Sequence, residues 1–186
     1  MAKSSSTRYV ILGLLSSEPL SGYDIKKLVD TTLGHFWSES YGRLYPTLKK
    51  LEEEGLAKSK VEKNPHKPDR IVYHITDAGL EELKLWLHKP AALPWVRVEI
   101  LLKLFFAHNV PLATSIDLIK QQRQALAQKL EMFDGFQRMV SEGEFDADLK
   151  RLYSLTILHG RMVHEARIRW CDEAIKLFTP KKKGAK

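Results

Sequence analysis

Cysteine and long apolar runs are nearly absent from this sequence. It contains one cysteine among 186 residues, which excludes an intramolecular disulfide and a metal cage built from thiolates alone. No apolar run approaches the roughly 20 residues that a transmembrane helix needs, and residues 1–6 have no apolar segment of the kind found in secretory signals. The sequence therefore predicts a protein of the reducing cytoplasm, with no membrane partner.

Motifs of catalysis and metal binding are also missing. The sequence has no H-E-x-x-H motif, phosphate-binding loop or G-x-G-x-x-G motif. His159 and His164 are separated by about 140° around a helix, so they do not share a face on which a metal could bind. Cys171 follows Trp170 on an amphipathic segment, where a cysteine is typically structural. We expect no enzyme, no cofactor and no metal site.

Positive charge is in excess, but it is spread unevenly. The formal net charge is +7, and residues 181–186 alone carry four lysines. Residues 1–79 have an excess of two cations, and residues 80–180 of one. A basic end of this kind is usually a solvated, disordered tail. Net charge by itself is therefore weak evidence for a nucleic-acid partner.

Three helices are predicted in the first part of the chain, from apolar residues at helical spacing. They span residues 7–16, 22–36 and 41–54. The first ends before Pro19, because the residue preceding a proline is pushed out of the helical region. Ser21 is placed to cap the second, with Asp24 in its first turn, and Gly55 is placed to end the third.

Two strands and a fourth helix follow. Residues 56–62 and 70–76 are strand-like, and the loop 63–69 between them contains two prolines and several basic side chains. Thr76 is placed to cap the next helix. Three helices, a basic hairpin and a further helix predict a winged helix-turn-helix over residues 1–89.

The composition changes at residues 90–94, and everything beyond is predicted to be helical. Helices are expected over residues 95–108, 112–140 and 146–178. Two helices of about 30 residues, each about 45 Å long, cannot bury their apolar faces against a small core. Residues 90–180 are therefore interpreted as a dimerisation domain built from long helices. The fold class is mainly α with a small β-hairpin.

A winged helix-turn-helix places the start of its third helix in the DNA major groove, where Arg43 can donate two hydrogen bonds to a guanine. The wing follows the backbone or minor groove through its cations. The alternatives are a solvated helix face, a hairpin kept soluble by lysines, and an interaction module that has lost DNA binding, which would carry acidic replacements at such positions. The candidate contacts are Ser38, Ser40, Tyr41, Arg43, Tyr45, Thr47, Lys49, Lys63, His66, Lys67 and Arg70.

Four blocks carry a family resemblance. They begin at Tyr9 (YVILGLL), Ser21 (SGYDIKK), Leu44 (LYPTLKKLEEEGL) and Tyr73 (YHITDAG). In this order they resemble the PadR family of bacterial transcriptional regulators, and the block from Leu93 (LPWVRVEILLKLFF) resembles the long helical domain of its larger subfamily.

The resemblance implies a homodimer that binds double-stranded DNA at a two-fold symmetric promoter site. Such proteins are usually repressors, with an activator of the same fold as the alternative, and many release DNA when a phenolic acid or a hydrophobic drug binds. By position, Tyr23, Tyr45 and the hairpin tip become expected DNA contacts.

The effector site is predicted only from aromatic residues. Trp86, Trp95 and Trp170 can line a pocket between the winged domain and the helical arm, with core packing and dimer contacts as the alternative. Trp95, which follows Pro94, is the best single candidate. In this hypothesis the long helices place two third helices roughly 34 Å apart, one DNA turn, and an effector near Trp95 changes that spacing.

Overall fold

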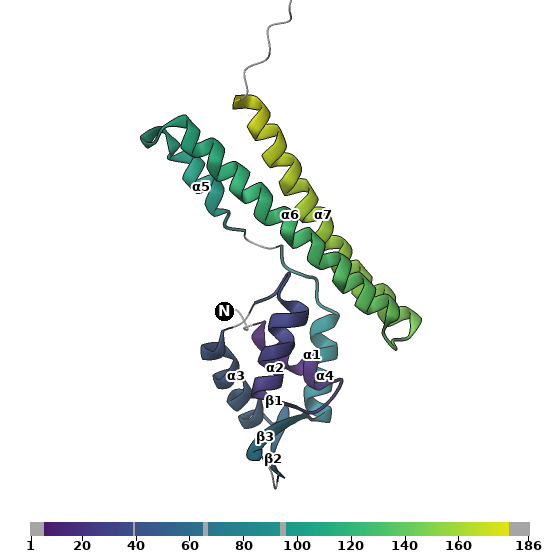
Figure 1. Ribbon diagram of the computed structural model, residues 1–186. Coiled ribbons are helices and arrows are strands. Elements are labelled where there is room, and N and C mark those ends of the chain that lie inside the picture. The colour runs from purple at the N-terminus through teal and green to yellow at the C-terminus, as the bar shows by residue number, and fades with distance from the viewer. Residues whose placement is uncertain (1–5, 39, 65–66, 94–95, 179–186) are drawn as a thin grey trace, which may run out of the picture. The chain divides into compact units, whose positions relative to one another are not determined.

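The computed structural model describes residues 6–38, 40–64, 67–93 and 96–178. The chain divides into two compact units, Met1–Leu93 and Pro94–Lys186, which are described in turn (Figure 1). Trp95, His66 and the basic end 181–186 lie outside the described residues, as do the side chains of Tyr41 and Lys67. Predictions that concern these groups stay predictions.

The N-terminal unit begins with three helices, as the apolar spacing predicts. The helices are α1 (Thr7–Leu15), α2 (Gly22–Leu28) and α3 (Tyr41–Glu53). Ser21 starts α2 through a reciprocal capping box: its hydroxyl accepts from the Asp24 amide at 3.2 Å, and the Asp24 carboxylate accepts from the Ser21 amide at 3.0 Å. The expected cap is thus confirmed.

The second helix differs from the single span expected over residues 22–36. After Leu28 the backbone continues as a π-helix, η1 (Val29–Leu33), and the helix ends there. Thr31 donates its hydroxyl to the Lys27 carbonyl at 2.8 Å. Such back-bonding by a threonine competes with the regular helical ladder and often bends it, which gives a physical reason for the change.

The sheet has three strands rather than two. Strands β2 (Ala57–Asn64) and β3 (Lys67–Ile75) form the expected hairpin, and β1 (Leu20–Ser21) adds to β3, giving the order β1-β3-β2. All pairs are antiparallel. The strands run further into the loop than predicted, so the wing is a longer ribbon, with an irregularity in its register between Glu62 and Asn64.

The hairpin is fastened to α3 and to α4 (Asp77–Leu87) at its base. Gly55 ends α3 with a φ of 72°, a conformation that glycine adopts without strain. Thr76 caps α4 by accepting from the Gly79 amide at 3.1 Å, and it donates to the Gly55 carbonyl at 2.8 Å. One hydroxyl therefore joins the end of α3, the end of β3 and the start of α4.

The described residues of this unit pack around one apolar core. Side chains from α1, α2, α3 and α4 meet in it, together with Leu20 of β1 and Ala57 of β2. Leu44, Leu48 and Leu51 are almost completely buried. Because they follow one stripe of α3, the opposite side of that helix faces solvent.

The described part of the C-terminal unit contains helices and the short segments that connect them. It contains α5 (Glu99–Phe105), a 3-10 turn η2 (Ala107–Asn109), and two long antiparallel helices, α6 (Leu112–Glu142) and α7 (Ala147–Phe178). The long helices match the expected spans closely. α5 is shorter than the expected 95–108, because residues 96–98 are not helical and Val98 has an extended backbone. Within the described residues, no helix combines the length and apolarity needed to cross a membrane.

Two small apolar clusters join α6 to α7. One contains Ile119, Leu126 and Cys171, and the other is built around Phe133. Phe133 lies against Gly160, where an added Cβ would come within 2.4 Å of the ring. Arg123 pairs with Asp172 at 2.5 Å, and Arg161 pairs with Asp134. These contacts fix the register of the helical hairpin.

Candidate nucleic-acid interface

The exposed side of α3 carries Arg43, the residue predicted to read a base. Its side chain is exposed, and in the described part of the chain no carboxylate lies within 4.0 Å of its guanidinium group. Leu44, the next residue, is fully buried, so the backbone that carries Arg43 is held firmly. An exposed guanidinium group on a well-held backbone, without an acidic partner among the described residues, suits bidentate hydrogen bonding.

Two tyrosines flank this position. Tyr23 of α2 is 64% exposed and Tyr45 of α3 is 47% exposed. The Tyr45 ring lies directly over Gly22, where an added Cβ would be only 2.6 Å from its Cε1 atom. The glycine therefore lets α2 and α3 approach closely enough for both tyrosines to share one surface.

The remaining predicted contacts on this side are arranged less uniformly. Ser38 and Ser40 are exposed, and the Ser40 hydroxyl makes no capping bond although Ser40 precedes α3. The Thr47 hydroxyl donates to the Arg43 carbonyl at 2.7 Å, so its proton is already used. Lys49 lies 3.8 Å from Glu53. Ser38 and Ser40 are thus more available to a ligand than Thr47 and Lys49.

On the wing, Lys63 and Arg70 differ. Lys63 is exposed and has no ion pair in the described part of the chain. Arg70 lies 3.0 Å from Glu62 and 3.6 Å from Asp24. The hydrogen bond from Ser21, and to a lesser extent the charge of Arg70, lower the pKa of Asp24 below its usual value. Arg70 therefore joins the wing to the start of α2.

The acidic side chains at the end of α3 form hydrogen bonds and ion pairs within the protein. Glu52 accepts hydrogen bonds from the amide and the hydroxyl of Ser59 on β2, and Glu54 pairs with Arg8 of α1 at 2.8 Å. These pairs hold the negative charge against α1 and β2, away from the exposed start of the helix. The basic and hydroxyl-bearing start of α3 and the acidic end are thus separated.

The chain matches two family models. Residues 11–85 match the PadR-like family of transcriptional regulators, and residues 96–179 match the virulence activator alpha C-terminal family. The negative transcriptional regulator PadR of Bacillus subtilis is 35% identical over 139 residues, which are 74% of this chain and 76% of that protein. This chain belongs to the PadR-like family.

Solved structures of PadR-like proteins show the same fold. Bacillus subtilis PadR in complex with operator DNA is 28% identical, with a TM-score of 0.84 over 95% of this chain and 99% of that one. The same protein with p-coumaric acid gives a TM-score of 0.74 at 28% identity, over 91% and 96% of the chains. The Vibrio cholerae virulence activator AphA is 32% identical, with a TM-score of 0.64 over 92% and 97%. The predicted family and fold class are confirmed.

The two described tryptophans of the effector hypothesis lie in different units of this PadR-like regulator. Trp86 of α4 stacks on Tyr9 of α1, with ring centroids 4.5 Å apart and an angle of 7° between the planes. The Tyr9 hydroxyl in turn donates to Glu82 at 3.1 Å. Trp86 thus takes part in the packing of the N-terminal unit, which is the alternative considered for it.

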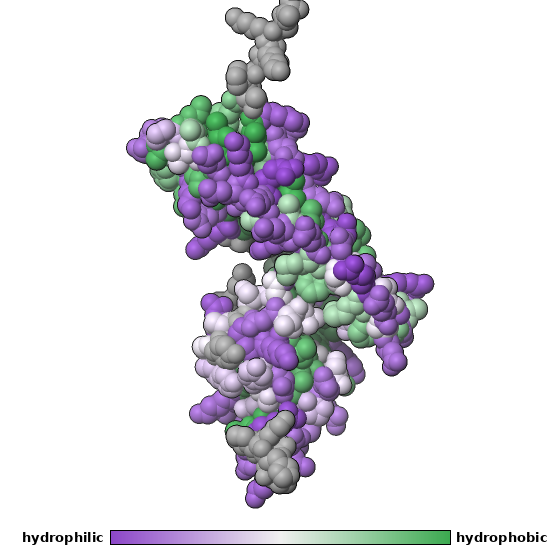
Figure 2. All heavy atoms as spheres, in the orientation of Figure 1, coloured by the Kyte–Doolittle hydropathy of each residue, from purple (hydrophilic) through white to green (hydrophobic). Residues whose placement is uncertain are grey.

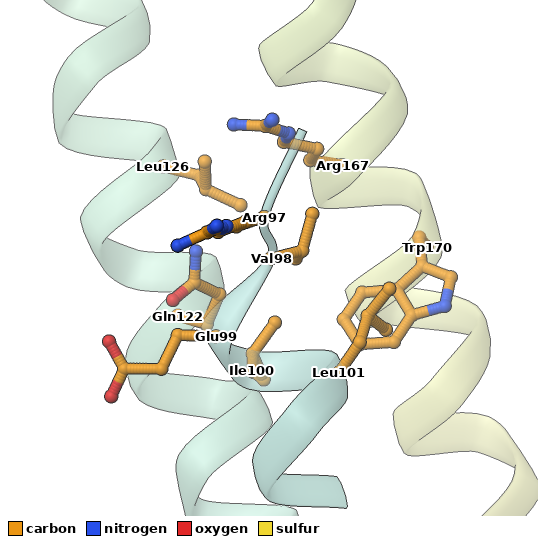
Figure 3. A pocket seen from close by; sticks show the side chains of 9 residues that line it. All are labelled: Arg97, Val98, Glu99, Ile100, Leu101, Gln122, Leu126, Arg167 and Trp170. Carbon is orange, nitrogen blue, oxygen red and sulfur yellow. The ribbon is translucent and has the colours of Figure 1, made fainter. Parts of the chain in front are cut away.

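Trp170 lines a pocket within the helical unit (Figure 3). Its partners there, Arg97, Gln122 and Arg167, were not predicted as site residues. One signal was present in the sequence, because Arg167 and Trp170 are three positions apart and share a helix face. Nothing local indicated that the segment around Arg97 would meet them. Among the described residues, no cluster of His, Cys, Asp and Glu side chains could hold a metal ion.

Proposed function

We propose that this protein is a homodimeric transcriptional repressor that binds a two-fold symmetric promoter site and works in the cytoplasm by binding, without catalysis. Residues 1–89 form its DNA-binding domain and residues 90–180 its dimerisation domain. The exposed start of α3, where Arg43 adjoins the buried Leu44 and has no described acidic partner, carries this proposal. The operator complex of Bacillus subtilis PadR supports it.

In this proposal α3 lies in the major groove, with Arg43 donating to a guanine. Tyr23 and Tyr45 contact phosphates or sugars on either side. The wing follows the DNA backbone, and Lys63 supplies charge that gains from counterion release. The acidic end of α3 is turned toward β2 and α1, so it does not repel the phosphates.

Dimer formation is supported by the apolar side chains that α7 leaves exposed. Leu152, Leu155, Leu158 and Met162 are each at least half exposed, and their spacing places them on one side of the helix. Figure 2 shows further apolar surface on this unit, around α5. Apolar surface of this extent on a folded unit is typical of an interface, and a second copy with the same stripe fits it.

Repression is the favoured direction of regulation. The curated relative at 35% identity is named a negative regulator, whereas AphA, which has the same fold, is named an activator. A reporter gene placed behind the upstream region of the gene that encodes this protein distinguishes repression from activation. Deletion of the protein should raise expression of the reporter, and a fall would establish an activator.

We further propose that a small phenolic acid releases the DNA, as supported by the p-coumaric acid complex of Bacillus subtilis PadR. Such an effector must bind the DNA-free form more tightly than the bound form, because a ligand shifts a two-state equilibrium only through that difference. The addition of p-coumarate should therefore weaken DNA binding in the assay below.

The decisive experiment is a gel shift on the upstream region of the gene that encodes this protein. We expect tight binding that weakens steeply with salt. Arg43→Ala should reduce the affinity by roughly tenfold to a hundredfold, because one bidentate base contact is worth about 1–3 kcal/mol. Arg169→Ala, which removes an exposed arginine of α7, is the matched control. Salt-insensitive binding, or equal affinities for the two variants, would contradict the proposal.

A further inference from the structure

The helical unit contains a pocket that is complete within one chain. Its cavity volume is about 350 Å³, in the range of small-molecule sites. Three segments line it: the residues that lead into and begin α5, one side of α6, and one side of α7 (Figure 3). The lining residues are Arg97, Val98, Glu99, Ile100, Leu101, Gln122, Leu126, Arg167 and Trp170.

One end of the pocket is cationic. Arg97 and Arg167 come from different segments, and no carboxylate in the described part of the chain lies within 4.0 Å of either guanidinium group. In Figure 3 the amide of Gln122 lies beside the guanidinium group of Arg97. Two guanidinium groups and an amide without an internal anion suit a carboxylate ligand.

The single acidic residue of the lining does not cancel this charge. Glu99 is paired with Lys103 at 2.8 Å, and its carboxylate points away from the Trp170 side of the pocket in Figure 3. The hydrogen bond and charge of Lys103 lower the pKa of Glu99. The Glu99 charge is therefore balanced on its own helix, and the two arginines set the sign of the pocket.

The other end of the pocket is apolar. Trp170 and Leu101 both line this end, and Ile100 lies beneath the cavity in the view of Figure 3. Leu126, which is almost completely buried, extends this surface between the helices. An aromatic or aliphatic body of a ligand can pack here while its charged group reaches the arginines.

We propose that this pocket binds a small amphipathic carboxylate, whose carboxylate group is held by Arg97 and Arg167 and whose apolar body packs on Trp170. The proposal rests on the proposed function, because it locates the effector site of the repressor within the helical unit. Of the predicted residues Trp86, Trp95 and Trp170, this site uses Trp170 and adds two arginines.

The position of the pocket also accounts for regulation. Residues 97–101 form one wall, and they directly follow the segment that connects the N-terminal unit to α5. A carboxylate held by Arg97 and Arg167 joins this wall to α7. The ligand therefore restricts the start of α5, and with it the chain that leads from the DNA-binding domain, which shifts the population of DNA-competent dimers.

The test is isothermal titration calorimetry of the full-length protein with p-coumarate, cinnamate and octanoate, and with their uncharged methyl esters. Each carboxylate should bind more tightly than its ester. Arg97→Gln combined with Arg167→Gln should lower the affinity for the carboxylates by about tenfold to a hundredfold, since charge-assisted hydrogen bonds are lost. The affinity for the esters should stay nearly unchanged. Trp170→Leu should weaken both acids and esters.

Arg169→Gln is the matched control. Arg169 lies on the same helix, about 200° around the axis from Arg167, is exposed and does not line the pocket. This variant should bind every probe as the wild type does. If the acids and esters bind equally, or if Arg169→Gln weakens binding as much as the double variant, the carboxylate site is refuted.

Two further outcomes separate this proposal from the proposed function. If no carboxylate binds the wild type below about 1 mM while the gel shift is normal, the pocket proposal fails and the repressor proposal stands. If the double variant changes the oligomeric state, the arginines belong to a contact between copies, which also overturns the pocket. Loss of DNA binding by the wild type with carboxylate binding intact overturns the repressor proposal alone.

Discussion

The two units of this protein have the same number of residues but bury their apolar side chains very differently. Among the described residues of the N-terminal unit, one continuous cluster holds twelve buried residues from α1, α2, η1, α3, α4 and two strands. In the helical unit the buried apolar residues form two separate clusters of three. A winged unit is therefore closed around its own core, whereas α6 and α7 close only along the line where they meet.

The exposed side chains complete this contrast. On the N-terminal unit the functional surface around α3 is polar, with Arg43, two serines and two tyrosines. The helical unit exposes a stripe of large aliphatic residues along α7 and a further group around α5. This difference supports the proposal that the first unit presents a polar surface to DNA and that the second is completed by another copy.

The largest effect is expected when charges are placed on the exposed apolar stripe of α7. Leu155→Glu combined with Met162→Glu places two carboxylates where both native side chains are about 60% exposed in the single chain. We expect monomers in light scattering. DNA affinity should fall on the order of a hundredfold or more, because the second half-site then has to be bound independently.

Thr156→Glu serves as the control for the charged stripe. Thr156 is an exposed residue of the same helix, about 100° around the axis from Leu155 and about 120° from Met162. The Thr156→Glu variant should remain dimeric and bind DNA normally. A double variant that is still dimeric would show that the copies meet elsewhere.

A second prediction tests the line where α6 and α7 meet. Gly160→Ala should destabilise the helical unit by about 1–3 kcal/mol, because its Cβ would lie 2.4 Å from the Phe133 ring. Gly135→Ala, on α6, has nothing within 4 Å of its added Cβ and should stabilise the helix by about 0.5–1 kcal/mol. Thermal unfolding followed by circular dichroism at matched concentrations measures both changes. Equal effects would show that Gly160 is only a helix-propensity position.

The sequence predicted most of the helices because their signals are local. Ser21 and Thr76 start helices by side-chain caps, and Gly55 ends one by its positive φ, so each boundary depends on one or two neighbouring residues. The long helices were predicted from periodicity that repeats over many turns. The same reasoning identified α3 and the wing as the candidate interface.

What the sequence did not reveal depends on contacts between distant residues. Strand β1 has only two residues, too few for a periodic signal, and exists because Leu20 pairs with Tyr73. Arg97 and Arg167 meet at one pocket although they are 70 positions apart. Arg70 was read as a basic wing residue, and only the fold shows that Asp24 lies beside it.

A third prediction concerns pH and the N-terminal unit alone. The Asp24 pKa is lowered by the Ser21 hydrogen bond in the folded state, so the stabilisation is complete above the usual aspartate value and is lost as the pH falls through the folded pKa. The loss should be about 1 kcal/mol, the worth of a helix cap. Denaturant titrations of wild type and Asp24→Asn across this acid range test it. The two proteins should converge at the lowest pH, and a constant difference would assign the effect to other carboxylates.

The smallest expected effect separates two cations of the wing. Lys63→Gln should lower the slope of log affinity against log salt by about 0.9 for each wing, the value of one phosphate contact. Arg70→Gln should lower it by less than half as much, because the guanidinium group is already shared between Glu62 and Asp24. The stability cost of Arg70→Gln should stay below about 1 kcal/mol, since the Arg70 side chain is exposed in both ion pairs. Equal slopes for the two variants would mean that Arg70 leaves its carboxylates for a phosphate when DNA binds. The wing would then be held by contacts with DNA rather than by its ion pair with α2. The N-terminal unit would depend on DNA for the position of its wing, although its core forms without DNA.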